Sequence, residues 1–322
     1  MQSPVSKIAD LIRRSDRFLV SSHANPDGDA IGSTVALGHI LAHMGKEVVL
    51  YNRSGMPKQF DWLDLPGPIH NSLVGCEANW IFVLDCGTQH RVGEELFRIM
   101  GTRPMANVDH HLGNPMFGQF NWVDETYPAV AAMIADLADE LEVPLVGPLA
   151  EAIYLGIVTD TGFFTFDSTT PSVMELAARL IRLGLNPGLV NAKIRNQWSI
   201  NRFRLWGESF ATTELYFGGQ VAVGFVTQAM MSRTDTTPAD CEEIVNFLRR
   251  LRGARAAVIL REEPDGSYKF SIRSTGKDNV QVVAALFDGG GHRNAAGGTI
   301  SADIQTAKER LIEALGESLG LV

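Results

Sequence analysis

Residues 17–33 have the sequence Arg17-Phe-Leu-Val-Ser-Ser-His23-Ala-Asn-Pro-Asp27-Gly-Asp29-Ala-Ile-Gly32-Ser33. The apolar run at the start predicts a buried strand, and the periodic pattern over residues 30–44 predicts a helix. A proline and a glycine between them favour a tight turn. Three side chains that can bind metal ions, His23, Asp27 and Asp29, therefore fall in one strand-to-helix loop.

The same alternation continues along the first half of the chain. Apolar runs predict further strands at residues 47–51, 80–85 and 105–109, with a helix at 92–100. Helices are predicted next at 128–141, 145–158 and 171–183. Strands separated by helices indicate parallel βαβ units, so we expect an α/β fold with a doubly wound, mainly parallel sheet.

Acidic or imidazole side chains stand where three of these strands end. They are His23, Asp85, Asp109, His110 and His111. Because ligands of open α/β sheets bind outside the carboxyl ends of the strands, these groups are expected along one edge of the sheet. Asp160 ends a predicted helix, where a carboxylate opposes the helix dipole and a cation would compensate it.

Taken singly, most of these groups have a simpler interpretation. Asp27 and Asp29 could form an ordinary turn that caps the next helix, Asp85 could be a helix cap, and Asp160 could be an exposed loop residue. Two adjacent histidines are harder to explain by chance among the eight in the chain.

Taken together, the groups favour a pair of divalent cations. So many carboxylates in one place would repel one another strongly without cations. Oxygen ligands with a few imidazoles suit Mn²⁺ or Mg²⁺ better than structural zinc. We expect Asp85 to bridge two ions, which would activate a bridging water for in-line attack on phosphorus. His111 could hydrogen-bond the phosphate or donate a proton.

The second half predicts a smaller α/β domain. Hairpins are expected at residues 212–226 and 256–273, the latter turning at Asp265-Gly266, with helices at 238–251 and 279–287, a short strand near Thr299 and a final helix. Residues 186–206 are polar and have no strand pattern, which indicates a helical linker. The expected domains are therefore 1–185, a linker at 186–211, and 212–322.

A glycine-rich loop in this second half, Gly289-Gly290-Gly291-His292-Arg293, is a candidate anion site. Bare backbone lets N–H groups approach phosphate oxygens, while His292 and Arg293 add donors or charge. Arg273 and Ser274, at a predicted strand end, offer a second contact. A merely flexible loop is the alternative interpretation.

Composition limits the function classes. The net charge is −9, from 28 basic and 37 acidic residues, which argues against binding of long duplex DNA by phosphate neutralisation. Three cysteines (Cys76, Cys86 and Cys241) match neither a disulfide framework nor a zinc site. This cysteine usage makes a reduced, cytoplasmic setting the expectation. No apolar run approaches a membrane span, and the first 17 residues lack the apolar core of a signal peptide.

In combination, these motifs resemble the DHH/DHHA1 phosphoesterase family. The resemblance covers nearly the whole chain, and its two-domain length is similar to the short nanoRNase/pAp phosphatase branch, often labelled exopolyphosphatase-like or RecJ-like. Asp288 departs from the pattern, because relatives often carry another glycine there. The absence of added nucleic-acid modules disfavours the long single-strand DNA exonucleases of the family.

The resemblance implies a role for each matching position. His23, Asp27 and Asp85 would hold one Mn²⁺, and Asp29, Asp85, His110 and Asp160 the other. Asp109 would support the site from behind, and His111 would face the scissile phosphate. The remaining substrate would be held by Arg273, Ser274, Gly290, Gly291, His292 and Arg293.

The sequence therefore predicts a Mn²⁺-dependent phosphoesterase acting on very short RNA, 3′-phosphoadenosine 5′-phosphate (pAp), or both, with Mg²⁺ as an alternative ion. A phosphodiesterase for cyclic dinucleotides or pApA would use the same centre. A pyrophosphatase or exopolyphosphatase is disfavoured by the glycine-rich loop, and a non-catalytic nucleotide-binding protein by the full set of ligands. Substrate preference stays open, and so does a homodimer.

Overall fold

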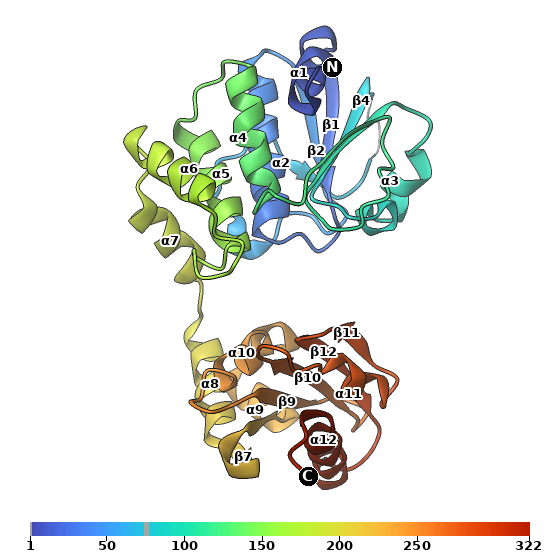
Figure 1. The fold of residues 1–322 in the computed structure, drawn as a ribbon, viewed down its shortest axis with the longest axis vertical. Coiled ribbons are helices and arrows are strands. Elements are labelled where there is room, and N and C mark those ends of the chain that lie inside the picture. Colours follow the sequence, from blue (N-terminus) through green and yellow to red (C-terminus); the bar gives the residue numbers. More distant parts are fainter. Residues whose placement is uncertain (1, 74–76) are drawn as a thin grey trace. The chain divides into compact units, whose positions relative to one another are not determined.

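The chain divides into two compact units. The computed structural model describes residues 2–73 and 77–322, and contacts within it separate the chain between Gln197 and Trp198. Cys76 lies outside the described residues. Each unit is built around its own six-stranded sheet (Figure 1). No helix in the described part of the chain combines the length and apolar character that a bilayer span requires.

The N-terminal sheet is parallel, as predicted. Its strands run in the order β3-β2-β1-β4-β5-β6. They are β1 (Arg17–Ser22), β2 (Glu47–Tyr51), β3 (Ile69–His70), β4 (Trp80–Leu84), β5 (Met105–Asp109) and β6 (Phe120–Val123). Because β1 pairs with both β2 and β4, the order of strands reverses there, and open α/β sheets bind ligands beside such a reversal.

Alternate residues of the strands fill two cores, one on each face of the sheet. Phe18 and Phe82 belong to the core under one helical layer, and Leu19 and Ile81 to the core on the opposite face. The first layer contains α1 (Pro4–Arg14), α2 (Gly28–His43), α4 (Val130–Glu140) and α5 (Gly147–Asp160). The second face is covered by η2 (Gln89–Val92) and α3 (Glu94–Ile99). The unit is completed by η1 (Lys58–Phe60), α6 (Pro171–Arg182) and α7 (Pro187–Arg195).

Two glycines let α2 and α5 approach closely. A Cβ on Gly32 would lie 2.5 Å from the carbonyl oxygen of Ala152, and one on Gly156 would lie 2.5 Å from Oδ1 of Asp29. This close approach brings the beginning of α2 next to the end of α5. The aspartates at those two helix ends, Asp29 and Asp160, are thereby brought to the same place.

The C-terminal unit has a mixed sheet in the order β11-β12-β10-β9-β8-β7. Its strands are β7 (Glu214–Tyr216), β8 (Val221–Val226), β9 (Ala256–Glu262), β10 (Tyr268–Ser274), β11 (Gly290–His292) and β12 (Ala295–Ile300). Its helices are α8 (Ile200–Ala211), α9 (Gln228–Thr234), η3 (Phe217–Gly219), η4 (Pro238–Cys241), α10 (Ile244–Leu248), α11 (Gln281–Ala285) and α12 (Ile304–Leu319).

The structure differs from the sequence analysis in three local features. The continuous helix predicted at residues 238–251 is two short helices, because Glu243 adopts a left-handed conformation with φ of 74°. The pattern did not predict α9 or the short strands β3 and β6. The glycine-rich loop is partly a strand, since Gly290–His292 pairs with β12.

The glycines of this segment serve strand packing more than an open loop. A Cβ on Gly289 would lie 2.3 Å from the carbonyl oxygen of Gly297, and one on Gly291 would lie 2.4 Å from that of Ala295. Around Gly290, in contrast, no described atom lies within 4 Å of the added Cβ. Asp288 has φ of 54°, a left-handed conformation that glycine adopts most readily.

We expect Gly32→Ala to destabilise the N-terminal unit by about 1–3 kcal/mol, because the methyl group would meet rigid backbone. Urea unfolding followed by circular dichroism measures the change. Gly207→Ala on α8 is the control: among the described residues no atom crowds that position, so the unfolding midpoint should stay constant or rise. An unchanged midpoint for Gly32→Ala would contradict the close helix packing.

Candidate metal centre at the edge of the parallel sheet

The loop after β1 places two potential ligands while it starts α2. Oδ1 of Asp27 accepts hydrogen bonds from the backbone N–H groups of Asp29 (3.2 Å) and Ala30 (3.1 Å) and so caps the helix. Its other oxygen, Oδ2, lies 3.8 Å from Nε2 of His23. The simpler interpretation of Asp27 as a cap is therefore correct, yet one carboxylate oxygen remains directed toward the candidate site.

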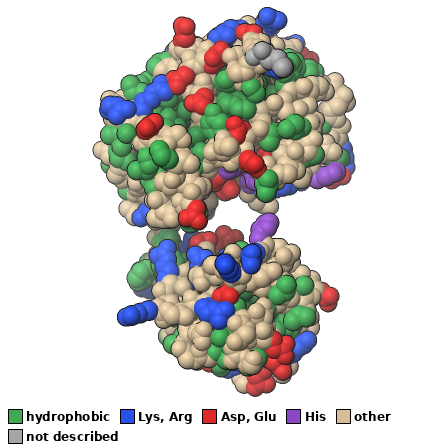
Figure 2. Space-filling model, in the orientation of Figure 1, with side chains coloured by type: hydrophobic (Ala, Val, Ile, Leu, Met, Phe, Trp, Pro, Cys, Tyr) green, Lys and Arg blue, Asp and Glu red, His purple; other side chains and the backbone are tan. Residues whose placement is uncertain are grey.

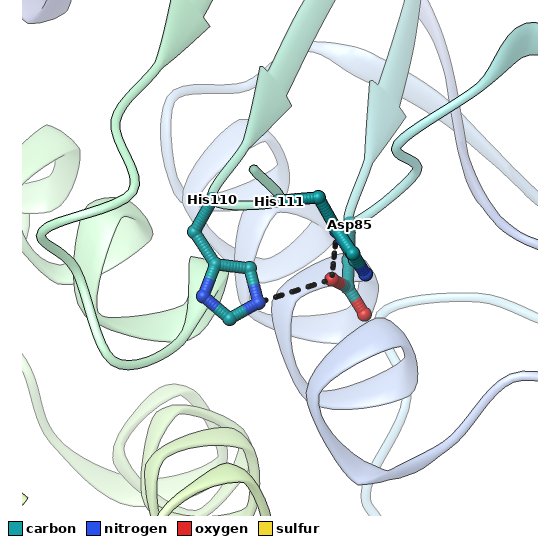
Figure 3. Close-up of side chains that lie close together, drawn as sticks. All are labelled: Asp85, His110 and His111. Carbon is teal, nitrogen blue, oxygen red and sulfur yellow. Dashed lines mark ion pairs between the residues drawn. The ribbon is translucent and has the colours of Figure 1, made fainter. Parts of the chain in front are cut away.

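Asp85 occupies the middle of the site. It follows β4, is 2% exposed, and has φ of 49°. Its Oδ1 lies 3.6 Å from both Nε2 of His110 and Nδ1 of His111, and its Oδ2 lies 3.6 Å from Nε2 of His23. Figure 3 shows the ion pairs of the two adjacent imidazoles meeting at one oxygen of this carboxylate.

These separations exceed hydrogen-bonding distance. Oδ1 of Asp85 consequently has no hydrogen-bond partner among the described residues, although it is buried. A buried carboxylate oxygen without a partner is costly, and a bound cation would remove that cost.

Backbone carbonyls orient two of the imidazoles. Nδ1 of His23 lies 2.9 Å from the carbonyl oxygen of Ala24, and Nδ1 of His110 lies 3.1 Å from that of Tyr127. Since a carbonyl oxygen can only accept, Nδ1 must carry the proton in both rings. Nε2 is then the atom that faces the carboxylates, as in metal-bound histidines.

The side chain of Asp29, the second residue of α2, lies against the beginning of α4. It is fully buried, and its two oxygens accept hydrogen bonds from the backbone N–H groups of Val130 (2.5 Å) and Ala131 (2.8 Å). The helix dipole of α4 favours a negative charge there. Asp160, the last residue of α5, places Oδ2 3.3 Å from Nε2 of His110.

The donor atoms fit divalent cations. In each of two groups, His23-Asp27-Asp85 and Asp29-His110-Asp160, the ligand atoms lie within 4.8 Å of one another. The chain thus brings together the histidines and aspartates that the sequence nominates as ligands. A third group, Asp85-His110-His111, overlaps both.

Opposing charges shift the pKa values of the site strongly. Burial lowers the pKa of His110, but the carboxylates of Asp85, Asp29 and Asp160 outweigh it and raise the pKa to about 10. Burial also lowers the pKa of His23, but hydrogen bonding with Asp27 and Asp85 outweighs it and raises the pKa to about 10.

The carboxylates divide into two kinds. Burial, followed by the charges of Asp85 and Asp160, raises the pKa of Asp29 well above its usual range. Burial and the charges of Asp85 and Asp27 raise the pKa of Asp160 to about 7. The pKa of Asp85 is lowered despite burial, because His110 and His23 stabilise its charge. Without cations, the site therefore retains protons near neutral pH.

His111 is held differently from His110. Its Nδ1 lies 2.7 Å from Oδ1 of the fully buried Asp109, so that nitrogen carries a proton. The hydrogen bond with Asp109 raises the pKa of His111. The other oxygen of Asp109 accepts from Nδ2 of Asn114 at 2.5 Å. His111 therefore lies beside the donor groups in a fixed orientation. Its Nδ1 is already occupied by the hydrogen bond to Asp109.

In the C-terminal unit, the strand register places Arg273 and His292 on one face of the sheet. Arg273 lies opposite Ala295, which lies opposite His292, and residues opposite one another point to the same side. Gly290 and Gly291 are in the exposed strand β11. How these residues lie relative to the centre in the N-terminal unit stays a prediction.

Two other predicted contacts in this unit are engaged locally. Ser274 is fully buried, and its hydroxyl donates to the carbonyl of Asp278 and accepts from Asn294. The guanidinium of Arg293 donates to the carbonyl of Lys277 through Nε and Nη2, at 3.2 and 2.7 Å. Both side chains hold the turn, and binding of substrate by Ser274 would require its bonds to break.

Sequence reasoning missed several groups that position the ligands. Tyr127, Val130 and Ala131 act through backbone atoms, which no side-chain pattern reveals. Asn114 acts through its side chain. Its position five residues after Asp109, in a glycine-containing loop, was the available signal.

The fold and the site define a class of protein: a two-unit α/β protein with a carboxylate–imidazole centre at the carboxyl edge of a parallel sheet. Family comparison makes this specific. Residues 17–157 match the DHH family N-terminal domain, and residues 218–320 match the DHHA1 domain. The chain belongs to the DHH family and carries a DHHA1 domain.

Similar proteins span nearly the whole chain. The bifunctional oligoribonuclease and PAP phosphatase NrnA of Thermus thermophilus is 32% identical, covering 93% of this chain and 89% of the relative. That of Bacillus subtilis is 28% identical over 88% and 90%. The crystal structure of an exopolyphosphatase-related protein from Bacteroides fragilis has a TM-score of 0.89 and 26% identity, covering 100% of this chain and 98% of that one.

We expect binding of Mn²⁺ to release protons and to strengthen as the pH rises from 6 to 8. Groups with a raised pKa, His23, His110 and Asp160, hold protons near neutral pH, and ligation requires their loss. Calorimetric titration in buffers of different ionisation enthalpy counts the protons. The exposed His43 supplies the control, because His43→Ala should leave the count unchanged. Binding without proton release would contradict the coupling.

Proposed function

We propose that the chain is a Mn²⁺-dependent phosphoesterase that hydrolyses very short oligoribonucleotides, pAp, or both. The observation that carries the proposal is Asp85, a buried carboxylate without a hydrogen bond on Oδ1, shared by overlapping groups of donors. The names of the relatives support the substrate class, since both act on oligoribonucleotides and PAP.

In this proposal the donor groups would hold two ions. His23, Asp27 and Asp85 would hold the first, and the remaining donors together with Asp85 would hold the second, namely Asp29, His110 and Asp160. Two divalent cations there would lower the pKa of a water molecule and neutralise charge on the phosphoryl oxygens.

The protein's own groups would orient the substrate and handle protons. His111 donates from Nδ1 to Asp109, so its Nε2 is the atom available to a phosphoryl oxygen or a leaving group. Asp109 stabilises the positive charge of the ring, and Asn114 fixes Asp109 in turn. In the C-terminal unit, Arg273 and His292 share a face and would bind the terminal nucleotide.

A substrate panel tests the proposed activity. With Mn²⁺, we expect release of mononucleotides from a diribonucleotide and of phosphate from pAp, measured by chromatography, and slower hydrolysis with Mg²⁺. The panel includes cyclic di-AMP, pApA and pyrophosphate. If neither the diribonucleotide nor pAp is hydrolysed while another compound is, the proposal fails.

Two substitutions separate metal binding from chemistry. Asp85→Asn should remove metal from the purified protein and abolish hydrolysis, because both ions lose a shared ligand. His111→Gln should retain metal and lower kcat by about 10²–10⁴-fold. Metal analysis and steady-state rates measure both effects. Retention of full metal content by Asp85→Asn would instead favour a protein that binds nucleotides through other groups.

A further inference from the structure

The C-terminal sheet has one face that helices cover only in part. Leu205 of α8, Met231 of α9 and Val245 of α10 pack over Ala257 and Ile259 of β9. The register places three residues of the next strand on this same face: Arg273 opposite Ala257, Ser271 opposite Ile259, and Lys269 opposite Arg261. Lys269 is exposed, and Ser271 and Arg273 are half-buried. This part of the face is therefore accessible.

A pocket of about 550 Å³ lies between β10 and the segment 238–245, which includes the beginning of α10. Pro238, Val245 and Ile259 give it an apolar wall. Its polar lining consists of three side chains of β10, one of β9 and two that precede α10, namely Lys269, Ser271 and Arg273, then Arg261, then Glu242 and Glu243. Polar and charged side chains predominate in this lining, and convergent polar groups of this kind fix the orientation of a bound ligand. Figure 2 shows Lys and Arg side chains gathered at one end of this unit.

The charges along β10 are not equivalent. Arg261, beside Lys269, is engaged by Glu263 at 2.6 Å and by the carbonyl of Pro238 at 3.2 Å. Lys269 forms no ion pair with any described residue. It stands four residues from Arg273, which is about 13 Å along a strand. This distance is longer than the spacing between the two phosphates of pAp, which are separated by a single sugar.

We propose that the pocket is a second nucleotide subsite, specific for oligoribonucleotides. Lys269 binds the phosphate beyond the nucleotide held at Arg273, and the intervening base lies against Val245 and Ile259. Glu242 and Glu243 would repel phosphate but accept hydrogen bonds from base amino groups, which sets the orientation. This inference rests on the proposed function. It explains how the protein could distinguish longer substrates from pAp, which has no phosphate to place at Lys269.

The test compares a triribonucleotide with pAp. We expect Lys269→Ala to raise KM for the triribonucleotide about five- to tenfold and to leave KM for pAp within twofold. Lys269→Glu should enlarge the same difference. Because Lys269 is exposed, both variants are expected to fold like the wild type, which circular dichroism checks.

The control is Lys308→Ala. Lys308 is on α12, which packs against the opposite face of the sheet, and it pairs with Glu214. Its removal changes the net charge equally and should alter neither KM.

Equal losses on both substrates, or no loss on either, would overturn the subsite. If the wild type hydrolyses neither these compounds nor the diribonucleotide but does hydrolyse another compound of the panel, the proposed function fails. Calorimetric binding of the triribonucleotide and pAp to metal-free protein then decides on the subsite separately. Weaker binding of the triribonucleotide alone in Lys269→Ala supports it, and any other result refutes it.

Discussion

The N-terminal unit depends on the burial of negative charge. Asp29 and Asp85 lie in the interior, where an uncompensated carboxylate would cost several kcal/mol. Asp29 is compensated by two backbone N–H groups at the beginning of α4, and Asp85 by imidazoles that are near but not within hydrogen-bonding distance. The negative charge of Asp85 is therefore only partly stabilised by the protein itself. Bound cations would supply the remaining stabilisation.

The architecture explains why these groups meet. The order of strands reverses beside β1, so the loops after β1 and β4 open on the same side, and the parallel direction of β5 brings its histidines to the same edge. Close packing of α2 and α5 through small residues then supplies the last aspartate from a helix end. Four elements distant in sequence thereby contribute to one site.

Much of this could be predicted because it is carried by side chains at strand ends. The apolar runs located β1, β2, β4 and β5, and the acids and imidazoles following them located the edge. What failed has physical causes. The helix expected at residues 238–251 is interrupted by the left-handed Glu243, which no periodicity reports. The glycines near His292 were expected in an open loop, whereas close packing between strands also requires most of them, and their binding of phosphate stays a prediction.

The imidazoles of His23 and His110 are oriented by main-chain oxygens of Ala24 and Tyr127. Such contacts persist whatever side chain occupies those two positions, provided the loop keeps its course. These two contacts therefore do not depend on the identity of the neighbouring side chain, and a comparison of residue identities would overlook them. Engineering that shortens or re-routes either loop would disturb the imidazoles even though every ligand was retained.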